Sequence, residues 1–125
     1  MKTGRPSLTA SYVALARAIA THERRLSSVS QDPWAERLLP GALGGPLTRA
    51  ARARLAPQLF ALLRMGMLGM ADHMALRTRM IDDAVATAVA HGARQLVVVG
   101  AGLDSRAHRL PALAECAVFE VDFPS

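Results

Sequence analysis

Two short apolar runs stand out near the end of the chain, each bounded by polar or glycine-containing segments. Residues 96–99 read Leu-Val-Val-Val, and residues 117–121 read Ala-Val-Phe-Glu-Val. Runs of this length that are rich in β-branched residues are typical of strands buried on both faces. The pattern therefore predicts two strands, over 96–99 and 117–121, separated by a loop and a short helix over 105–113.

Apolar residues recur at helical spacing in the first part of the chain, which predicts a helix capped by Ser7 or Thr9 and ending near Arg25. Its apolar face is expected to hold Tyr12, Leu15, Ala16 and Ile19. After a polar break over 26–31, Asp32 and Pro33 predict the start of a short helix, since aspartate caps free N–H groups and proline has none to satisfy. The apolar side of this helix is expected to hold Trp34, Leu38 and Leu39.

The segment 40–46, Pro-Gly-Ala-Leu-Gly-Gly-Pro, is expected to be a linker because glycine and proline interrupt regular structure. It divides the chain into an N-terminal helical cap with its linker, 1–47, and a second part, 48–125, with further helices and both strands. A helical pattern resumes at Thr48, and Pro57 is expected to kink or restart it.

Residues 60–70 are apolar nearly all round, which predicts that other structure covers this helix. Within and after this stretch, Met67, Met70 and Met74 share a helical face, either as ordinary core or as a flexible pocket wall. A further helix is expected over 78–91, ended by Gly92 as a C-cap glycine. Its expected apolar side is Met80, Ile81, Ala84, Val85, Ala88 and Val89.

Composition narrows the class of protein. The 125 residues suffice for one domain, and 51% of them are hydrophobic. The net charge of +5 comes almost wholly from arginines spread from Arg5 to Arg109, whereas nucleic-acid binders concentrate their charge in a stripe with stacking aromatics. The single Cys116 excludes an intramolecular disulfide, and the four histidines show no ligand-like clustering, so we expect no metal site. No apolar segment reaches the ~20 residues of a membrane span and no signal-peptide pattern occurs, so we expect a cytoplasmic protein.

The candidate chemistry lies between and after the two predicted strands. Gly100 and Gly102 directly follow the first strand, and glycine lets a ligand approach the backbone without meeting a Cβ. The start of the next helix offers free N–H groups. Asp122 ends the second strand 22 positions after Gly100, close to the spacing at which an acidic residue accepts ribose hydroxyls. These positions predict a nucleoside-binding α/β sheet.

Three ordered blocks resemble the leucine carboxyl methyltransferase family, and in particular its bacterial branch of S-adenosylmethionine-dependent O-methyltransferases. They are Arg-Thr-Arg-Met-Ile-Asp-Asp at 77–83, the segment 92–106 with Gly100-Ala101-Gly102-Leu103-Asp104-Ser105-Arg106, and Phe-Glu-Val-Asp-Phe-Pro at 119–124. Thr9-Ala10, Ala16-Arg17-Ala18 and Asp32-Pro33-Trp34-Ala35 are also similar to the opening of that branch. The resemblance covers most of the chain from Thr9 onward.

The resemblance implies a class I methyltransferase (Rossmann-like) sheet with S-adenosyl-L-methionine across the strand ends and a small-molecule carboxylate or hydroxyl as methyl acceptor. It places the backbone of Gly100, Ala101 and Gly102 beside the methionyl and ribose groups, and the ribose hydroxyls on Asp122. Arg79, with Arg77 as the second candidate, would pair with the methionyl carboxylate, which suits a guanidinium.

Several other residues are open to more than one interpretation. Asp82 and Asp83 are expected to cap or to pair with neighbouring arginines rather than to act in catalysis. Asp104 fits either a brace for backbone N–H groups or a ligand contact, and Arg17 is a further pocket candidate. No residue can be singled out as a general base.

Two departures from the family pattern qualify the resemblance. Many class I methyltransferases carry an acidic residue two positions before the first loop glycine, where this chain has Val98. Family members also continue well beyond their second strand, whereas this chain ends at Ser125. We therefore expect an incomplete sheet with an uncovered edge. We also expect that two copies of the chain could associate through this edge.

Three other functions stay open on the sequence. A dehydrogenase could hold NAD with Gly100, Gly102, Ser105 and Asp122, although the long helical segment before the first strand counts against it. The chain could instead be an inactive helical interaction module. Nucleic-acid binding by the arginines of 49–54 is the weakest of the three, because such a cluster is typical of a solvated helix end.

Overall fold

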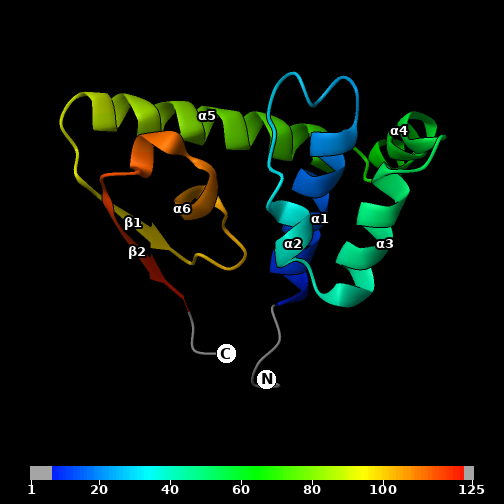
Figure 1. The fold of residues 1–125 in the computed structure, drawn as a ribbon, viewed down its shortest axis with the longest axis horizontal. Helices are drawn as coiled ribbons and strands as arrows, with labels where there is room; N and C mark the ends of the chain where they lie inside the picture. The colour runs from blue at the N-terminus through cyan, green and yellow to red at the C-terminus, as the bar shows by residue number, and fades with distance from the viewer. Residues whose placement is uncertain (1–6, 123–125) are drawn as a thin grey trace.

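The computed structural model describes residues 7–122 (Figure 1). Residues 1–6, which include Arg5, and residues 123–125, which include the Phe123-Pro124 part of the third sequence block, lie outside the described residues. The elements, in chain order, are α1 (Leu8–His22), α2 (Ala35–Leu38), α3 (Gly41–Ala51), α4 (Ala56–Gly66), α5 (Met70–Ala90), β1 (Gln95–Val99), α6 (Arg106–Arg109), the 3₁₀ helix η1 (Pro111–Leu113) and β2 (Ala117–Val121).

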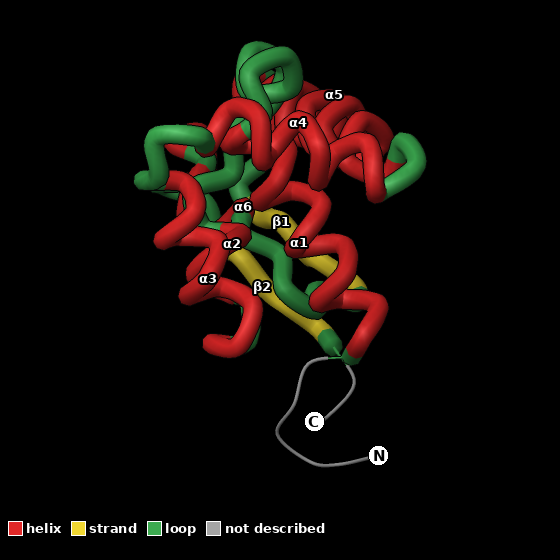
Figure 2. The backbone as a smooth tube through the Cα atoms, turned by 90° about the vertical axis from the view of Figure 1, so that its right-hand side faces the viewer, coloured by secondary structure: helices red, strands yellow, loops and turns green. Residues whose placement is uncertain are grey.

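Both predicted strands are confirmed, and they pair in parallel from Gln95 opposite Ala117 to Val99 opposite Val121. The crossover between them runs through the glycine loop, α6 and η1, so the predicted helix over 105–113 is present as two short pieces. The described part of the chain is thus an α/β protein with helices and a two-stranded parallel sheet. In Figure 2, viewed from the side of α3 and α4, the strands run side by side behind α1.

The expectation that both faces of the strands are buried is wrong for the described residues. Leu96, Val98 and Val118 are half-buried, whereas Val99 is 81% exposed and Phe119 is 51% exposed. The reason is that α5 and α6 lie on one side of the sheet, and no element of residues 7–122 covers the other (Figure 1). The apolar run predicts a strand correctly but does not reveal how many layers enclose it.

The hydrophobic core lies in the helical region, where α1 packs against α2, α4 and α5. Ser7 caps α1 as expected, its side chain accepting from the Ala10 N–H at 3.0 Å. The expected apolar face is only partly right, since Ile19 is buried but Tyr12 is 43% exposed. Because three helices surround its second half, α1 buries nearly every position there, mostly alanines: Ala14, Ala16, Arg17, Ala18, Ile19 and Ala20.

The expected linker over 40–46 is wrong, because Pro40 is the N-cap of α3 and residues 41–46 form the first half of that helix. Gly44 is buried, and a Cβ placed on it would lie 2.5 Å from the Glu36 carbonyl oxygen of α2. The glycine therefore permits a close approach of two helices, and α3 accommodates Pro46 in its interior. Helix α3 also runs through position 47, where the sequence placed its division of the chain.

The restart at Pro57 is confirmed, since α3 ends at Ala51 and Pro57 lies in the first turn of α4. The expected cover of residues 60–70 is found for Phe60 and Met67 but not for Leu62, Met65 or Leu68, which are largely exposed. Only the Phe60 side of α4 meets the rest of the described chain. Within residues 7–122 no single helix has the length and apolarity to cross a bilayer; α4 and α5 meet these criteria only as a pair, bent by 95°.

Helix α5 begins at Met70, eight positions before the predicted start at Thr78, and ends at Ala90. Gly92 follows with φ of 103°, which confirms it as the glycine that ends this helix. The expected apolar side is narrower than predicted, since Ile81, Val85 and Val89 are half-buried while Met80, Ala84 and Ala88 are exposed. The first half of α5 packs on α1 and its second half lies over η1, so this helix joins the helical region to the sheet (Figure 1).

We predict that Gly44→Ala lowers the free energy of unfolding by about 1–3 kcal/mol, because the new methyl group meets a backbone oxygen that cannot rotate away. Gly45→Ala is the matched control, since its Cβ would meet nothing closer than 3.9 Å. Alanine has the higher helix propensity, so the control should be neutral or stabilising by up to about 1 kcal/mol. Urea unfolding followed by circular dichroism measures both; equal destabilisation would contradict the close α2–α3 contact.

Candidate functional site

A cavity of about 340 Å³ lies where the loop after β1 meets α1 and α5. Three segments and one strand end line it. The N-terminal part contributes Ser7, Thr9, Ala10, Val13 and Arg17, α5 contributes Met74, Arg77, Thr78 and Ile81, the loop contributes Gly100, Ala101, Gly102, Leu103, Asp104 and Arg106, and Asp122 follows β2.

The loop at the strand end has the backbone geometry that its glycines allow. Gly100 has φ of 68° and Gly102 has φ of 54°, both in the left-handed region that residues with a Cβ rarely adopt. The Gly100 N–H donates to the Val121 carbonyl at 2.7 Å, which extends the pairing of the strands into the loop. A Cβ on Gly102 would lie 3.4 Å from the Ala10 side chain, so α1 packs closely against this turn.

Asp122 lies beside the glycine loop, as the spacing of the two strands predicts. Its Oδ2 accepts a hydrogen bond from the Gly102 N–H at 2.5 Å. Asp122 is exposed and, like Gly102, lines the cavity. The parallel register places Val121 opposite Val99, so both strands end at the same edge. The structure therefore brings Gly100, Ala101, Gly102 and Asp122 together.

The two candidate arginines of α5 point to different places. Arg77 lines the cavity, whereas Arg79 lies outside it and pairs with Asp83 at 2.7 Å, a hydrogen bond that raises the pKa of Arg79. Residues two apart on a helix are separated by about 200° around its axis, so both cannot face one site. The cavity side of α5 follows the helical spacing of one face: Met74, Arg77, Thr78 and Ile81.

The expected pairing of Asp82 and Asp83 with arginines is confirmed. Asp82 accepts from Arg106 at 3.0 Å and from Arg109 at 2.6 and 2.9 Å. Asp104 combines both interpretations left open by the sequence, since its Oδ1 accepts from the Arg106 N–H at 2.8 Å while the residue also lines the cavity.

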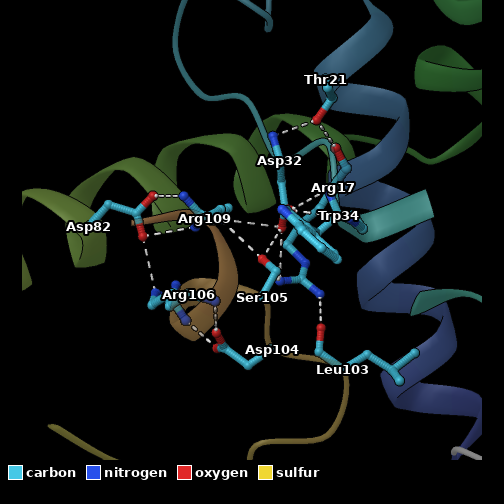
Figure 3. Close-up of polar contacts among 11 residues, drawn as sticks. Arg17, Thr21, Asp32, Trp34, Asp82, Leu103, Asp104, Ser105, Arg106 and Arg109 are labelled. Carbon is cyan, nitrogen blue, oxygen red and sulfur yellow. Dashed lines mark hydrogen bonds and ion pairs between the residues drawn. The ribbon is translucent and has the colours of Figure 1, made fainter. Parts of the chain in front are cut away.

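A buried polar network connects the cavity loop to the helical region (Figure 3). Arg17 lies 3.1 Å from the Asp32 carboxylate and donates to the Leu103 carbonyl. The Ser105 hydroxyl donates to Asp32 at 2.6 Å and accepts from the Arg109 Nε at 3.0 Å. Arg17 is 7% exposed, Asp32 2% and Ser105 0%, so these groups interact out of contact with bulk water.

Charges within the network balance. Three arginines, 17, 106 and 109, meet three aspartates, 32, 82 and 104, and all six side chains are at most 14% exposed. Burial lowers the pKa of Arg17, and the attraction of Asp32 opposes that shift. An arginine remains charged under such conditions, so each buried cation needs its carboxylate. Among the described atoms, the Arg17 Nε is buried without a hydrogen-bond partner.

The sequence suggested Arg17 as a pocket candidate and Asp32 as a helix cap. It suggested Ser105 as a helix start or, in the dehydrogenase alternative, as part of an NAD-binding loop. One signal for the network is present in the sequence: Arg17 stands alone among Ala14, Ala16, Ala18 and Ile19, on the most apolar part of α1. A buried arginine demands a carboxylate. The sequence does not tell which of the ten acidic residues supplies it.

The described residues contain no group of three or more histidine, cysteine, aspartate or glutamate side chains placed to hold a metal ion. Cys116 is half-buried next to the start of β2, and its thiol lies 3.8 Å from the carbonyl oxygens of Ala93 and Ala112. It lies outside the cavity at the strand ends.

Taken together, fold and cavity define an α/β protein in which a glycine loop and an acidic strand end face one cavity under a helical cover. The chain belongs to the leucine carboxyl methyltransferase family, whose sequence model matches residues 10–125.

Three relatives illustrate the similarity, and each is named as an S-adenosyl-L-methionine-dependent methyltransferase. One from Mycobacterium sp. (strain KMS) is 43% identical over 120 residues, covering 93% of this chain and 38% of the relative. One from Streptomyces coelicolor is 39% identical over 125 residues, covering 95% and 38%. One from Mycobacterium tuberculosis (strain ATCC 25177 / H37Ra) is 37% identical over 124 residues, covering 93% and 38%. The chain therefore spans less than two fifths of the length of these relatives.

We predict that Asp32→Ala lowers the free energy of unfolding by about 3–5 kcal/mol, because it leaves the buried Arg17 without its carboxylate. Asp83→Ala is the matched control, since it breaks an exposed i,i+4 pair with Arg79 and should change stability little. Thermal and urea unfolding of both variants test this. A loss for Asp32→Ala no larger than for the control would contradict the role of the buried pair.

Proposed function

We propose that this chain forms the S-adenosyl-L-methionine site of a methyltransferase with a class I (Rossmann-like) sheet. The observation that carries the proposal is the convergence of the glycine loop, Asp122 and Arg77 on one cavity of about 340 Å³. That volume lies within the range of about 300–1,000 Å³ that small-molecule sites occupy. Membership in the family and the names of the relatives support the same conclusion.

The residues present fit the parts of the cofactor. Gly100, Ala101 and Gly102 line the cavity, and the two glycines carry no Cβ that would keep a ligand away from the backbone. Asp122 supplies carboxylate oxygens for a pair of vicinal hydroxyls such as those of a ribose. When bound, S-adenosyl-L-methionine supplies an electrophilic methyl group on its sulfonium, so the protein has to bind and orient donor and acceptor.

Arg77 is our choice for the residue that binds the methionyl carboxylate. It lines the cavity on the same face of α5 as Met74 and Thr78. Arg79, the first candidate on the sequence, is engaged by Asp83 outside the cavity. A guanidinium can pair with a carboxylate through two parallel hydrogen bonds, which gives both affinity and orientation.

The proposed reaction is O-methylation of a carboxylate or hydroxyl of a small molecule. The cavity wall formed by Thr9, Ala10 and Val13 of α1 and by Met74 and Ile81 of α5 is mostly apolar, and suits the non-reacting part of such an acceptor. An NAD site is the competing proposal for the same loop, and the binding experiments below include NAD for that reason.

We predict that S-adenosylhomocysteine binds the chain and that Asp122→Ala weakens this binding by about 10- to 100-fold, the effect of removing a charged hydrogen-bond acceptor. Asp122→Asn is the control for loop geometry, because its amide oxygen can still accept from the Gly102 N–H. It should fall between wild type and Asp122→Ala. Isothermal titration calorimetry measures these affinities, and binding of NAD but not S-adenosylhomocysteine would refute the proposal.

We further predict that Arg77→Ala weakens S-adenosylhomocysteine binding by about 10- to 100-fold, because the methionyl carboxylate loses a charged partner. Arg79→Ala is matched in residue type, helix and solvent exposure, and should leave the affinity within about twofold. The same calorimetric titration measures both variants. A larger loss for Arg79→Ala than for Arg77→Ala would contradict our assignment.

A further inference from the structure

The buried network joins parts of the chain that lie far apart in sequence and that the proposed binding contacts do not use. Arg17 lies in the middle of α1, Asp32 precedes α2, and Leu103 and Ser105 belong to the loop after β1. Each belongs to a segment that the sequence resemblance singled out. Figure 3 shows their side chains and the Leu103 carbonyl meeting at one point between α1 and the loop.

We propose that Arg17, held by Asp32, is a positioning residue that fixes the loop 100–105 against α1 and thereby sets the shape of the cofactor cavity. The effect on cofactor binding that we infer rests on the proposed function. Its structural part, that Arg17 holds the loop, stands independently of which ligand the cavity accepts.

The loop is held at both ends, and Arg17 acts at the end that faces the helical region. At the sheet end, Gly100 donates to Val121 and Gly102 donates to Asp122. At the helical end, the guanidinium of Arg17 reaches the Leu103 carbonyl with one terminal nitrogen, and lies 3.5 Å from Ser105 Oγ with the other. The Ser105 hydroxyl donates in turn to Asp32.

Asp32 can serve as a fixed anchor because its own position is determined by several bonds. Its N–H donates to the Thr21 hydroxyl at 2.8 Å, and its Oδ1 accepts from the N–H groups of Trp34 and Ala35 at 3.2 and 3.1 Å. The Thr21 hydroxyl donates to the Arg17 carbonyl at 2.9 Å, which closes a ring of contacts back to α1. A side chain held in this way positions its partner precisely enough to affect a binding site.

Helix α1 therefore acts on the cavity in two ways. Its first turns line the cavity with Thr9, Ala10 and Val13, and Arg17 follows on the same face one turn later. Because Ala10 also packs against Gly102, a shift of the loop relative to α1 would change the wall and the glycine turn together. Arg17 prevents that shift.

Arginine is required for this role because its planar fork reaches two acceptors in different directions. Arg17→Lys keeps the positive charge that balances Asp32, but a single ammonium cannot bond both the Leu103 carbonyl and the Asp32 carboxylate in the same geometry. The variant thus keeps the positive charge that folding requires and removes the contact that positions the loop. Arg64→Lys is the matched control, since Arg64 also pairs with an aspartate, Asp72, but does so between α4 and α5.

The experiment is amide hydrogen exchange on the full chain, with the Tm measured alongside. In Arg17→Lys we expect exchange at Gly102 and Asp104 to accelerate at least tenfold while residues 82–90 of α5 keep their wild-type rates. Arg64→Lys should leave the loop unchanged. If Arg17→Lys does not fold, Ser105→Ala takes its place, because it cuts the link between the loop and Asp32 without altering any charge. Loop exchange at wild-type rates in the folded variant would overturn the inference.

Calorimetric titration with S-adenosylhomocysteine on the same proteins distinguishes this inference from the proposed function. If wild type binds, the affinity of Arg17→Lys should fall at least tenfold, and an unchanged affinity would overturn the role in cofactor binding. If wild type does not bind but loop exchange still accelerates in Arg17→Lys, the proposed function fails for this chain while the positioning role of Arg17 stands.

Discussion

The rest of the structure depends on a pair of charges that water does not reach. Arg17 and Asp32 are nearly fully buried, and the polar side chains beside them, Ser105 and Arg109, belong to the same network. The desolvation penalty for two such ions is large, and their mutual attraction and their further hydrogen bonds offset it. Here the remaining bonds of Asp32 start α2, and the second bond of Arg17 holds the loop after β1. One ion pair thus fixes the relative positions of α1, α2 and the strand end.

Glycine has two different roles in this chain, and only one of them is visible as a turn. At Gly100 and Gly102 the backbone adopts positive φ, which opens the strand end toward the cavity. At Gly44 the backbone is helical, and the missing side chain lets α3 approach the carbonyl of Glu36. The two roles share a physical cause, the absence of Cβ, but the first produces a turn and the second a close contact between helices. That is why the glycine-rich segment over 40–46 predicted a linker and forms a helix instead.

On helix α5, the position of a side chain around the helix axis decides which neighbour it contacts. Arg77 lines the cavity and Arg79 pairs with Asp83, while Asp82 accepts hydrogen bonds from the two arginines of α6. Met74 and Thr78 are buried, and Arg77, one turn after Met74 and next to Thr78, lines the cavity with them. A single helix therefore supplies a core face, a ligand candidate and a counter-ion for the network, because a helical repeat of 3.6 residues presents each to a different neighbour.

The sequence by itself determined the local elements and the edge of the sheet where the site lies. The strands over 96–99 and 117–121, the cap at Ser7, the restart at Pro57 and the C-cap at Gly92 follow from short-range sterics and hydrogen bonding, which need no knowledge of distant neighbours. The proximity of Gly102 and Asp122 also followed, because parallel strands end at the same edge. Only the tertiary structure decided which arginine of α5 faces the cavity, which faces of the strands and of α4 are covered, and which carboxylate neutralises Arg17. Those outcomes depend on contacts between residues that are 15 to 88 positions apart, and such contacts are set by how the helices pack rather than by the residues at either end.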